Sequence, residues 1–298
     1  MIGAAVVLYK TSSLPSIITK LASDHNLTSI YLIDNTGCDA IEQQVYDLSI
    51  KYSKIKIIRN SSNLGLAINY NLVAYELIKL NYKYLFIFDQ DSDIEDSYIS
   101  LMLHATGSFA RFGILAPLVL DKNTNKTQRI TSLNRLFFSV QSTSLKNMPT
   151  FIKTDFVISS GSLLNLSVLN QIGGYDVSFF VDHVDTDYCM MLKKRCEDIY
   201  IVTNAILHHE IGKRTVKKIF GLSIFPNNHN SFRRRNIAKN SIFLLKKHSQ
   251  LSFWTLIISR IFYESITILI FEDNKINKLS SIFLGLIDGI STNKSRFR

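Results

Sequence analysis

The sequence predicts an α/β fold built on a doubly wound, mostly parallel sheet flanked by helices, followed by a helical C-terminal extension. Over the first hundred residues, apolar runs of strand length alternate with helical stretches, as in such sheets. The chain has 298 residues, 46% of them hydrophobic and 19% charged, which is enough for one large domain with a full core. The last third is both basic and apolar, and this sets it apart from the alternating region.

The expected elements follow in chain order. Small and β-branched runs predict parallel strands at 2–8, 29–33, 55–59 and 84–88. Helical patterns lie between them at 15–23, 40–51 and 66–80. Beyond these the pattern is mixed: a strand at 114–120, two or three strands within 130–160, a short helix ending at 173–174, and helices at 184–195 and 236–249.

The formal net charge of +10 is unevenly placed. After residue 190 there are 19 Lys and Arg against 7 Asp and Glu, whereas residues 1–190 hold 15 against 17. The segment 211–247 has ten basic residues and no acidic one. Such a patch favours a polyanionic partner: nucleic acid, anionic lipid or a diphosphate. No interleaved aromatic platform or nucleic-acid motif accompanies it, so we do not expect nucleic acid.

Cysteines and apolar segments indicate the compartment. Cys38, Cys189 and Cys196 lie at no metal-ligand spacing and are expected to be free thiols in a reducing compartment. The N-terminus has no basic region before its short apolar run, which predicts a first strand and not a signal peptide. The apolar stretch 251–271 is interrupted by Arg260 and Glu264, so a firm membrane span is not predicted.

The strongest candidate site follows the predicted strand at 84–88. That strand runs directly into Asp89, with Asp91 and Asp93 close behind. Doubly wound sheets bind ligands beyond the carboxyl ends of their strands. Crowded carboxylates repel one another unless a cation lies among them, and Mg²⁺ uses one or two carboxylates together with substrate phosphates. The pattern predicts a divalent-cation site at Asp89 and Asp91; the alternative is a solvated acidic turn.

A second acidic group lies at Asp182, Asp185 and Asp187, at the start of the helix predicted at 184–195. A helix N-terminus favours anions, so the group could simply be an acidic N-cap. A carboxylate there could also serve as a general base towards a hydroxyl group. We choose Asp185 as the base, with Asp182 and Asp187 as supporting charges.

Three weaker features have structural alternatives. The loop of Asn63 and Gly65, with Asn69 one helical turn on, would bring backbone close to a ligand, or it is an ordinary loop-to-helix junction. One of His208 and His209 could contact a metal or phosphate, although no third ligand has zinc spacing. The basic run ending in Arg235 would bind a diphosphate or an anionic membrane, or it is a solvated face.

Taken together, these residues resemble family 2 glycosyltransferases of the GT-A fold, and more narrowly the bacterial rhamnosyltransferases of O-antigen and capsule synthesis. The resemblance runs from about residue 6 to 289. The form Asp89-Gln90-Asp91-Ser92 is the part most specific to the rhamnosyl branch. The wider family shares the remaining motifs, which lie at Tyr9, Asp34-Asn35, Asn63 to Asn69, Ser159 to Ser162, Gly173 to Asp176, Asp182 to Asp187, His209 to Gly212 and Arg235-Asn236.

The resemblance implies a role for each matching residue. The nucleotide would be bound by Tyr9, Asp34, Asn63, Gly65, Asn69, Asp89 and Gln90. The cation, Mg²⁺ or Mn²⁺, and the diphosphate would be held by Asp89, Asp91 and His209, with Arg235 near the diphosphate. Asp185 would be the catalytic base, and the acceptor side would be lined by Ser160 and Gly161. Residues 1–230 would form the catalytic domain, with a nucleotide-sugar half at about 1–110 and an acceptor half at 111–230, and 231–298 the C-terminal region.

The implied reaction is inverting transfer of rhamnose from dTDP-L-rhamnose to a growing glycan on a polyprenyl diphosphate lipid. We expect a cytoplasmic protein, peripheral at the inner face of the cytoplasmic membrane, whose basic and apolar C-terminal region lies on the anionic surface. Two alternatives stay open: a UDP-sugar donor, or a non-catalytic membrane-associated protein of glycan assembly. A nucleotidyltransferase would need a glycine-rich basic loop after the first strand, which residues 9–13 do not form.

Overall fold

The computed structural model describes the whole chain except residues 36–38, 144–146, 211, 213, 220–221 and 293–298. The chain forms two compact units, which we describe one at a time. The first contains Met1–Leu120 and Ser144–His209, and the second contains Asp121–Thr143 and Glu210–Arg298. The expected functional division into 1–230 and 231–298 stays a prediction.

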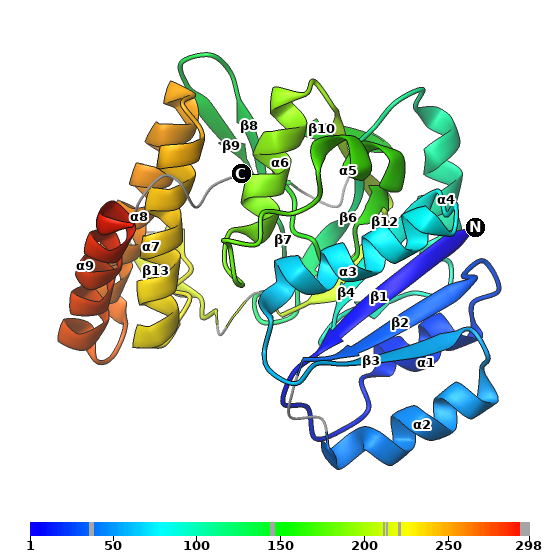
Figure 1. Ribbon diagram of the computed structural model, residues 1–298. Coiled ribbons are helices and arrows are strands. Elements are labelled where there is room, and N and C mark those ends of the chain that lie inside the picture. Colours follow the sequence, from blue (N-terminus) through cyan, green and yellow to red (C-terminus); the bar gives the residue numbers. More distant parts are fainter. Residues whose placement is uncertain (36–38, 144–146, 211, 213, 220–221, 293–298) are drawn as a thin grey trace. The chain divides into compact units, whose positions relative to one another are not determined.

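A mixed sheet forms the centre of the first unit, in the strand order β10-β12-β6-β11-β4-β1-β2-β3 (Figure 1). Its parallel half consists of β1 (Ile2–Leu8), β2 (Ser29–Asp34), β3 (Ile55–Arg59) and β4 (Tyr84–Asp89). Strands β1 and β2 are almost wholly buried, because helices cover both faces of the sheet. All four lie where the sequence predicts them.

The helices of this half cover opposite faces because the strand order reverses. From β1 the chain moves outward through β2 to β3, then returns to place β4 on the other side of β1. Right-handed crossovers put α1 (Ser16–Ser23) and α2 (Glu42–Lys51) on one face and α3 (Gly65–Lys79) on the other. Figure 1 shows α3 crossing in front of β1 and β4. The point of reversal between β1 and β4 is where ligands bind in such sheets.

Antiparallel strands complete the sheet. Strand β11 (Leu163–Asn165) runs antiparallel to both β4 and β6 (Ile114–Asp121), and β10 (Phe151–Thr154) pairs with β12 (Ile199–His209). The short β5 (Asp93–Ile94) pairs with the last residues of β12. Three more helices belong to this unit: α4 (Tyr98–Ala105), α5 (Leu166–Ile172) and α6 (Val184–Lys194), with 3₁₀ turns at Asp39–Ile41 and Thr106–Ser108.

The second unit is mainly helical. Its long helices are α7 (Ser231–Lys247), α8 (Leu251–Phe271) and α9 (Lys275–Ser291), and α7 packs closely along α9. Helix α7 begins five residues before the predicted 236 because the Asn230 side chain caps it, accepting a hydrogen bond from the Arg233 amide. Short strands accompany them: β7 (Lys126–Thr127), β8 (Ile130–Leu133), β9 (Phe138–Gln141), β13 (Lys217–Ile219) and β14 (Leu222–Ile224).

Buried charges hold this helical unit together. The Arg234 guanidinium is fully buried and pairs with Glu264 and Glu272, each at 2.7 Å, and Lys278 reaches the second oxygen of Glu272 at 2.9 Å. Removing one member of such a network leaves a buried charge without its counter-charge, at a cost of about 3–5 kcal/mol. Arg234, which belongs to the basic segment 211–247, is therefore also part of the core of this unit.

Cysteines and the apolar stretch also have places in the structure. Cys189 is buried and Cys196 exposed, both as free thiols, whereas Cys38 lies outside the described residues. Among the described residues, α8 is the one helix that is long and apolar enough to cross a membrane, and most of its surface in the most apolar window is not buried in the protein.

Candidate active site

Strands β1, β2 and β4 end side by side at one edge of the sheet. Val7 lies opposite Asp89 and Leu8 opposite Asp34, so the residues that follow β1 meet both acids there. One carboxylate oxygen of Asp34, Oδ1, is enclosed and accepts no hydrogen bond within the described part of the chain. An enclosed acceptor of this kind favours a ligand hydroxyl or N–H group.

The antiparallel pairing of β5 with β12 adds His209 to this edge. His208 lies opposite Asp93, which brings the next residue of β12 beside the Asp89–Asp91 turn. His209 Nδ1 lies 3.2 Å from Asp91 Oδ1, and His209 Nε2 lies 3.7 Å from Asp89 Oδ2. One ligand atom from each of the three residues falls within 4.8 Å of the other two. Of the two adjacent histidines, it is therefore His209 that joins the acids.

This donor set suits a divalent cation. It offers two carboxylates, with side chains 35% and 40% exposed, and one imidazole that is 11% exposed, so the carboxylates are open to a ligand while the ring is held by the fold. Oxygen ligands with a single imidazole are acceptable to both Mg²⁺ and Mn²⁺. The two carboxylates could also bind a diphosphate through such a cation.

Gln90 ties the acidic turn to the end of β1. Its side-chain Oε1 accepts a hydrogen bond from the Tyr9 amide at 2.8 Å, and its Nε2 donates to the Tyr9 carbonyl oxygen at 3.2 Å. The oxygen and the nitrogen of the Gln90 side-chain amide therefore both bind the backbone of Tyr9. Gln90 follows β4 and Tyr9 follows β1, and the strand order reverses between these two strands. Gln90 was expected at the nucleotide; the structure shows it holding Tyr9, whose side chain is exposed.

Ser160 and Gly161 support the acidic turn from within the fold. The Ser160 hydroxyl is buried, accepts a hydrogen bond from the Asp89 amide at 3.2 Å and lies 2.7 Å from the Ser92 hydroxyl. Gly161 adopts a φ of +76°, and its carbonyl oxygen accepts a hydrogen bond from Tyr98. Both residues are buried in this structure, and their expected place on the acceptor side stays a prediction.

An asparagine network shapes the loop before α3. Asn35 accepts hydrogen bonds from Asn60 and from the Leu64 amide, and it donates to Asn63 at 2.7 Å. Asn60 also donates to Asn69 at 2.8 Å. Asn69 is fully buried, so its part in nucleotide binding would be to hold this loop and not to touch the ligand. Asn35 and Asn60 were not singled out as site residues, although the density of asparagines in this stretch was a usable signal.

Gly65 approaches the protein's own chain. A Cβ atom at this position would lie 2.3 Å from the Phe180 carbonyl oxygen, and φ is +77°. The Leu66 amide donates to the same oxygen at 2.7 Å. The glycine thus lets the 60–65 loop pack against the segment that leads into α6, and its expected contact with the nucleotide stays a prediction.

Asp185 lies in the first turn of α6 and is half-buried. Its Oδ1 accepts a hydrogen bond from the Thr186 amide at 2.7 Å. The preceding His183 has a φ of +69°, unusual for a residue with a side chain. Asp182 is half-buried just before the helix, but Asp187 is fully buried and cannot act at the surface.

Arg235 belongs to the second unit. Its guanidinium forms two hydrogen bonds with the Asp288 carboxylate of α9, at 2.6 and 3.1 Å. A diphosphate would have to compete with this paired carboxylate, so the expected role of Arg235 at the diphosphate stays a prediction that the local contacts do not favour.

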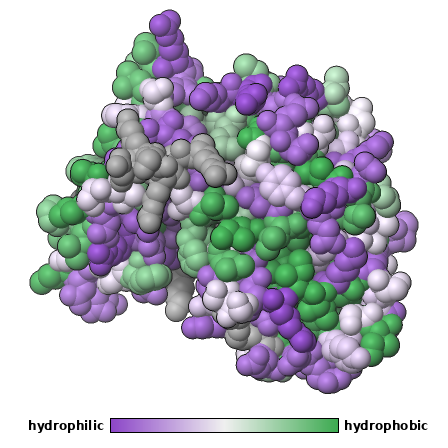
Figure 2. Space-filling view, in the orientation of Figure 1, coloured by the Kyte–Doolittle hydropathy of each residue, from purple (hydrophilic) through white to green (hydrophobic). Residues whose placement is uncertain are grey.

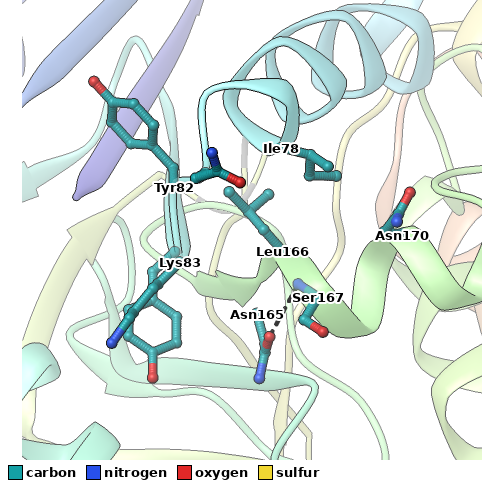
Figure 3. A pocket seen from close by; sticks show the side chains of 9 residues that line it. Ile78, Tyr82, Lys83, Asn165, Leu166, Ser167 and Asn170 are labelled. Atoms are coloured by element: carbon teal, nitrogen blue, oxygen red, sulfur yellow. Dashed lines mark hydrogen bonds between the residues drawn. The ribbon is translucent and has the colours of Figure 1, made fainter.

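A separate cavity of about 460 Å³ lies at the other end of β4, where the strand begins at Tyr84 (Figure 3). Asn165 lines it, but this side chain is used within the fold: it caps α5 by accepting from the Ser167 amide and donates to the Phe112 carbonyl oxygen. The acidic edge and this cavity are at opposite ends of β4, and the cavity offers no carboxylate.

Two comparisons relate this sequence to known proteins. The model of the family described as "Glycosyl transferase family 2" matches residues 6–173. The dTDP-rhamnosyl transferase RfbF of Shigella flexneri is 26% identical over 296 residues, covering 97% of this chain and 95% of that protein.

Solved structures share the fold. A mannosyltransferase of Pyrobaculum calidifontis, in complex with GDP-Man and Mn²⁺, superimposes with a TM-score of 0.55 at 8% identity, over 99% of this chain and 76% of that one. GalNAc-T7 with UDP, GalNAc and Mn²⁺ gives 0.57 at 13% identity, covering 89% of this chain and 57% of that longer one. The expected GT-A fold with a helical C-terminal extension is confirmed.

The family model matches more than half of the chain, across the strands whose ends carry Asp34 and Asp89. The chain is therefore a glycosyltransferase and belongs to glycosyl transferase family 2.

Proposed function

We propose that this enzyme transfers rhamnose from dTDP-L-rhamnose to an acceptor hydroxyl with inversion at the anomeric carbon. The observation that carries the proposal is the cluster of Asp89, Asp91 and His209 at the carboxyl edge of the sheet, beside the point where the strand order reverses. The choice of donor is supported by the near full-length similarity to a dTDP-rhamnosyl transferase and by the Asp-Gln-Asp-Ser form of the turn.

The protein's part in the reaction follows from its carboxylates. Asp185 accepts the proton of an acceptor hydroxyl while the hydroxyl oxygen forms a bond to the anomeric carbon. The bond between that carbon and the diphosphate oxygen breaks on the opposite side, and dTDP leaves with the electron pair. We assign nucleoside binding to Asp34, which has an enclosed acceptor oxygen, and to Tyr9, which follows the paired strand β1.

A cation would be held by Asp89, Asp91 and His209. The chemistry that Mg²⁺ or Mn²⁺ supplies there when bound is neutralisation of the negative charge on the departing diphosphate. Two neighbouring residues anchor the acidic turn: Gln90 bonds to Tyr9, and the Asp89 amide donates to Ser160.

The acceptor that we propose is a growing glycan on a polyprenyl diphosphate lipid, at the inner face of the cytoplasmic membrane. The second unit supports this with its charge: it holds 20 Lys and Arg against 6 Asp and Glu, a formal +14 in a chain of +10. A positive surface of this kind is attracted to anionic lipids.

Exposed apolar side chains accompany this charge. On α8 and α9 they recur at helical spacing and include Leu251, Trp254, Ile258, Phe262, Ile266, Leu269, Ile276, Phe283, Ile287 and Ile290. Figure 2 shows hydrophobic side chains between hydrophilic ones over α7 and α9 on one face of this unit. Apolar stripes beside basic residues are typical of helices that lie in a membrane interface.

The donor is tested by assaying purified protein with dTDP-L-rhamnose, UDP-GlcNAc, UDP-glucose and GDP-mannose in the presence of Mn²⁺. We expect release of dTDP from the first substrate and little turnover of the others. Turnover of a UDP-sugar alone would replace the donor and leave the enzyme class unchanged. No turnover of any donor, with membrane binding retained in Asp89→Ala, would support the non-catalytic alternative.

A further inference from the structure

The hairpin of β8 and β9 ends in two exposed apolar side chains. Leu133 pairs with Phe138, so residues 134–137 form the turn between the two strands. The Leu136 side chain is 52% exposed and the Phe137 side chain 69% exposed. Hairpin turns are ordinarily built from Gly, Asn, Asp, Ser and Pro, so turn formation does not explain an adjacent Leu and Phe at this place.

Asn134 closes this turn by bonding to its backbone. The Asn134 side-chain Oδ1 accepts hydrogen bonds from the Leu136 amide at 3.2 Å and from the Phe137 amide at 2.7 Å. The Asn134 amide donates to the Phe137 carbonyl oxygen at 3.0 Å. Backbone groups without a partner are costly to transfer into an apolar medium, and here these groups have partners. The turn is therefore suited to leave water together with its two apolar side chains.

The turn is also attached to the start of α8, in the same unit. The Asn134 carbonyl oxygen accepts hydrogen bonds from the Ser252 hydroxyl at 2.7 Å and from the Gln250 side-chain amide at 2.9 Å. Strand β9 contacts α8 along the hairpin (Figure 1). The first turn of α8 exposes Leu251 and Trp254, by 55% and 40%. Exposed apolar side chains therefore come from two segments that hydrogen bonds join.

The charge on these two segments has one sign. Segments 122–143 and 246–259 contain no Asp or Glu, and their basic residues are Lys122, Lys126, Arg129, Arg135, Lys246 and Lys247. A second copy of this chain would bring the same positive charge, and a nucleic acid would leave the apolar side chains in water. A surface with both positive charge and apolar side chains fits an anionic lipid bilayer, whose headgroups attract cations and whose acyl chains accept Leu and Phe.

We propose that Leu136 and Phe137 insert into the acyl layer of an anionic membrane and hold the start of α8 at its surface. This rests on the membrane-bound acceptor proposed above, and it adds a point of insertion to helices that lie in the interface. The occupant of the hairpin tip is thus the lipid and not another protein.

The test uses the fact that Trp254 is the only tryptophan of the chain. Combining Phe137→Trp with Trp254→Phe moves the single indole to the hairpin tip. With vesicles of phosphatidylserine and phosphatidylcholine, we expect its fluorescence to shift to shorter wavelength, and lipids brominated on their acyl chains to quench it, because the ring leaves water. Sedimentation of this variant with vesicles, without a shift or quenching, would overturn the proposal.

A matched pair of variants measures the contribution of the tip. Phe137→Asp should weaken vesicle binding about ten-fold or more, because one apolar side chain is no longer buried in lipid. Ile50→Asp on α2 in the first unit is the control, since Ile50 is also 69% exposed, and it should bind as the wild type does. Both positions are exposed, so the unfolding temperature should not change in either variant.

The outcomes separate the two proposals. If the wild type binds no vesicles, the membrane-bound acceptor fails together with the inserted hairpin. If the wild type binds vesicles and Phe137→Asp binds them equally well, only the hairpin proposal fails. A dimer in sedimentation velocity that Phe137→Asp abolishes, with vesicle binding intact, would assign the tip to a second copy and overturn the proposal.

Discussion

At the scale of single residues, the acidic turn depends on side chains that bind backbone. Gln90 carries no charge, yet it makes two hydrogen bonds to Tyr9, and Ser160 supports the Asp89 amide from below. These contacts cross between strands that are far apart in sequence. The residue between the two aspartates is therefore needed for its length and its amide group, which can donate and accept at the same time.

We predict that Gln90→Leu raises the KM for the nucleotide sugar by about ten-fold, with a smaller effect on kcat, because Tyr9 loses its position relative to Asp89. The stability cost should be below about 1 kcal/mol, since the freed Tyr9 groups are exposed and can bind water. Steady-state kinetics and thermal unfolding check this. Gln43→Leu, which removes an exposed amide that donates a hydrogen bond to Asp47 on α2, serves as the control.

Asp185→Asn should lower kcat by on the order of 10³-fold while leaving donor binding close to wild type, since a proton acceptor is lost and not a nucleotide contact. The comparison is Asp182→Asn, whose half-buried carboxylate precedes the helix. Single-turnover measurements separate chemistry from release of dTDP. A larger loss in Asp182→Asn than in Asp185→Asn would move the base to Asp182.

At the scale of elements, two loops meet. The 60–65 loop is shaped by asparagines and reaches the 178–183 segment at Phe180, directly before the helix of Asp185. Parts of the chain expected to serve the nucleotide and the acceptor are thereby connected through one backbone contact. Disrupting this contact should therefore lower both the stability of the protein and its turnover rate.

Gly65→Ala is predicted to destabilise the protein by about 1–3 kcal/mol and to lower kcat, because the new Cβ would meet the Phe180 backbone at a left-handed φ. Gly107→Ala is the control: a Cβ there meets nothing within 4 Å. Chemical denaturation and donor turnover measured on both variants test this. If Gly65→Ala is as stable and active as Gly107→Ala, the contact has no such role.

At the scale of the whole molecule, charge divides between the two units. The first unit holds 14 Lys and Arg against 18 Asp and Glu, and the second holds the excess of basic residues. The candidate active site thus lies in the acidic unit, while the basic unit carries exposed apolar helices. This division supports different ligands for the two units: a metal and nucleotide for one, an anionic surface for the other.

We predict that the protein sediments with vesicles containing phosphatidylserine, binds neutral vesicles less, and is released by salt. Ile258→Glu, on the exposed face of α8, should weaken vesicle binding about ten-fold or more, since burying one such side chain contributes about 1.5–3 kcal/mol. Ile50→Glu on α2, a site in the first unit that is even more exposed than Ile258, should have no effect. Binding to neutral and anionic vesicles alike would remove the electrostatic part of the proposal.

Much of the fold could be predicted because its signals are local. The four parallel strands and the helices between them depend on runs of apolar residues, and these lie within an element or its neighbours in sequence. Helix α4 (Tyr98–Ala105) was not predicted, and α9 (Lys275–Ser291) was expected only as part of a helical region at 231–298, without its own bounds. The antiparallel pairing of β5 with β12 joins residues more than a hundred positions apart, so no local sequence pattern predicts it.

By itself the sequence determined the class of protein, the strand that delivers Asp89, and the acidic start of α6, because each is a short run of residues with its own chemistry. Only the tertiary structure decided that His209 and not His208 joins the acids, that Gln90 holds Tyr9, and that Ser160 and Asn69 lie inside the fold. The reason is physical: which atoms a side chain can reach depends on strand register and helix packing, and these are fixed by contacts between residues distant in the chain.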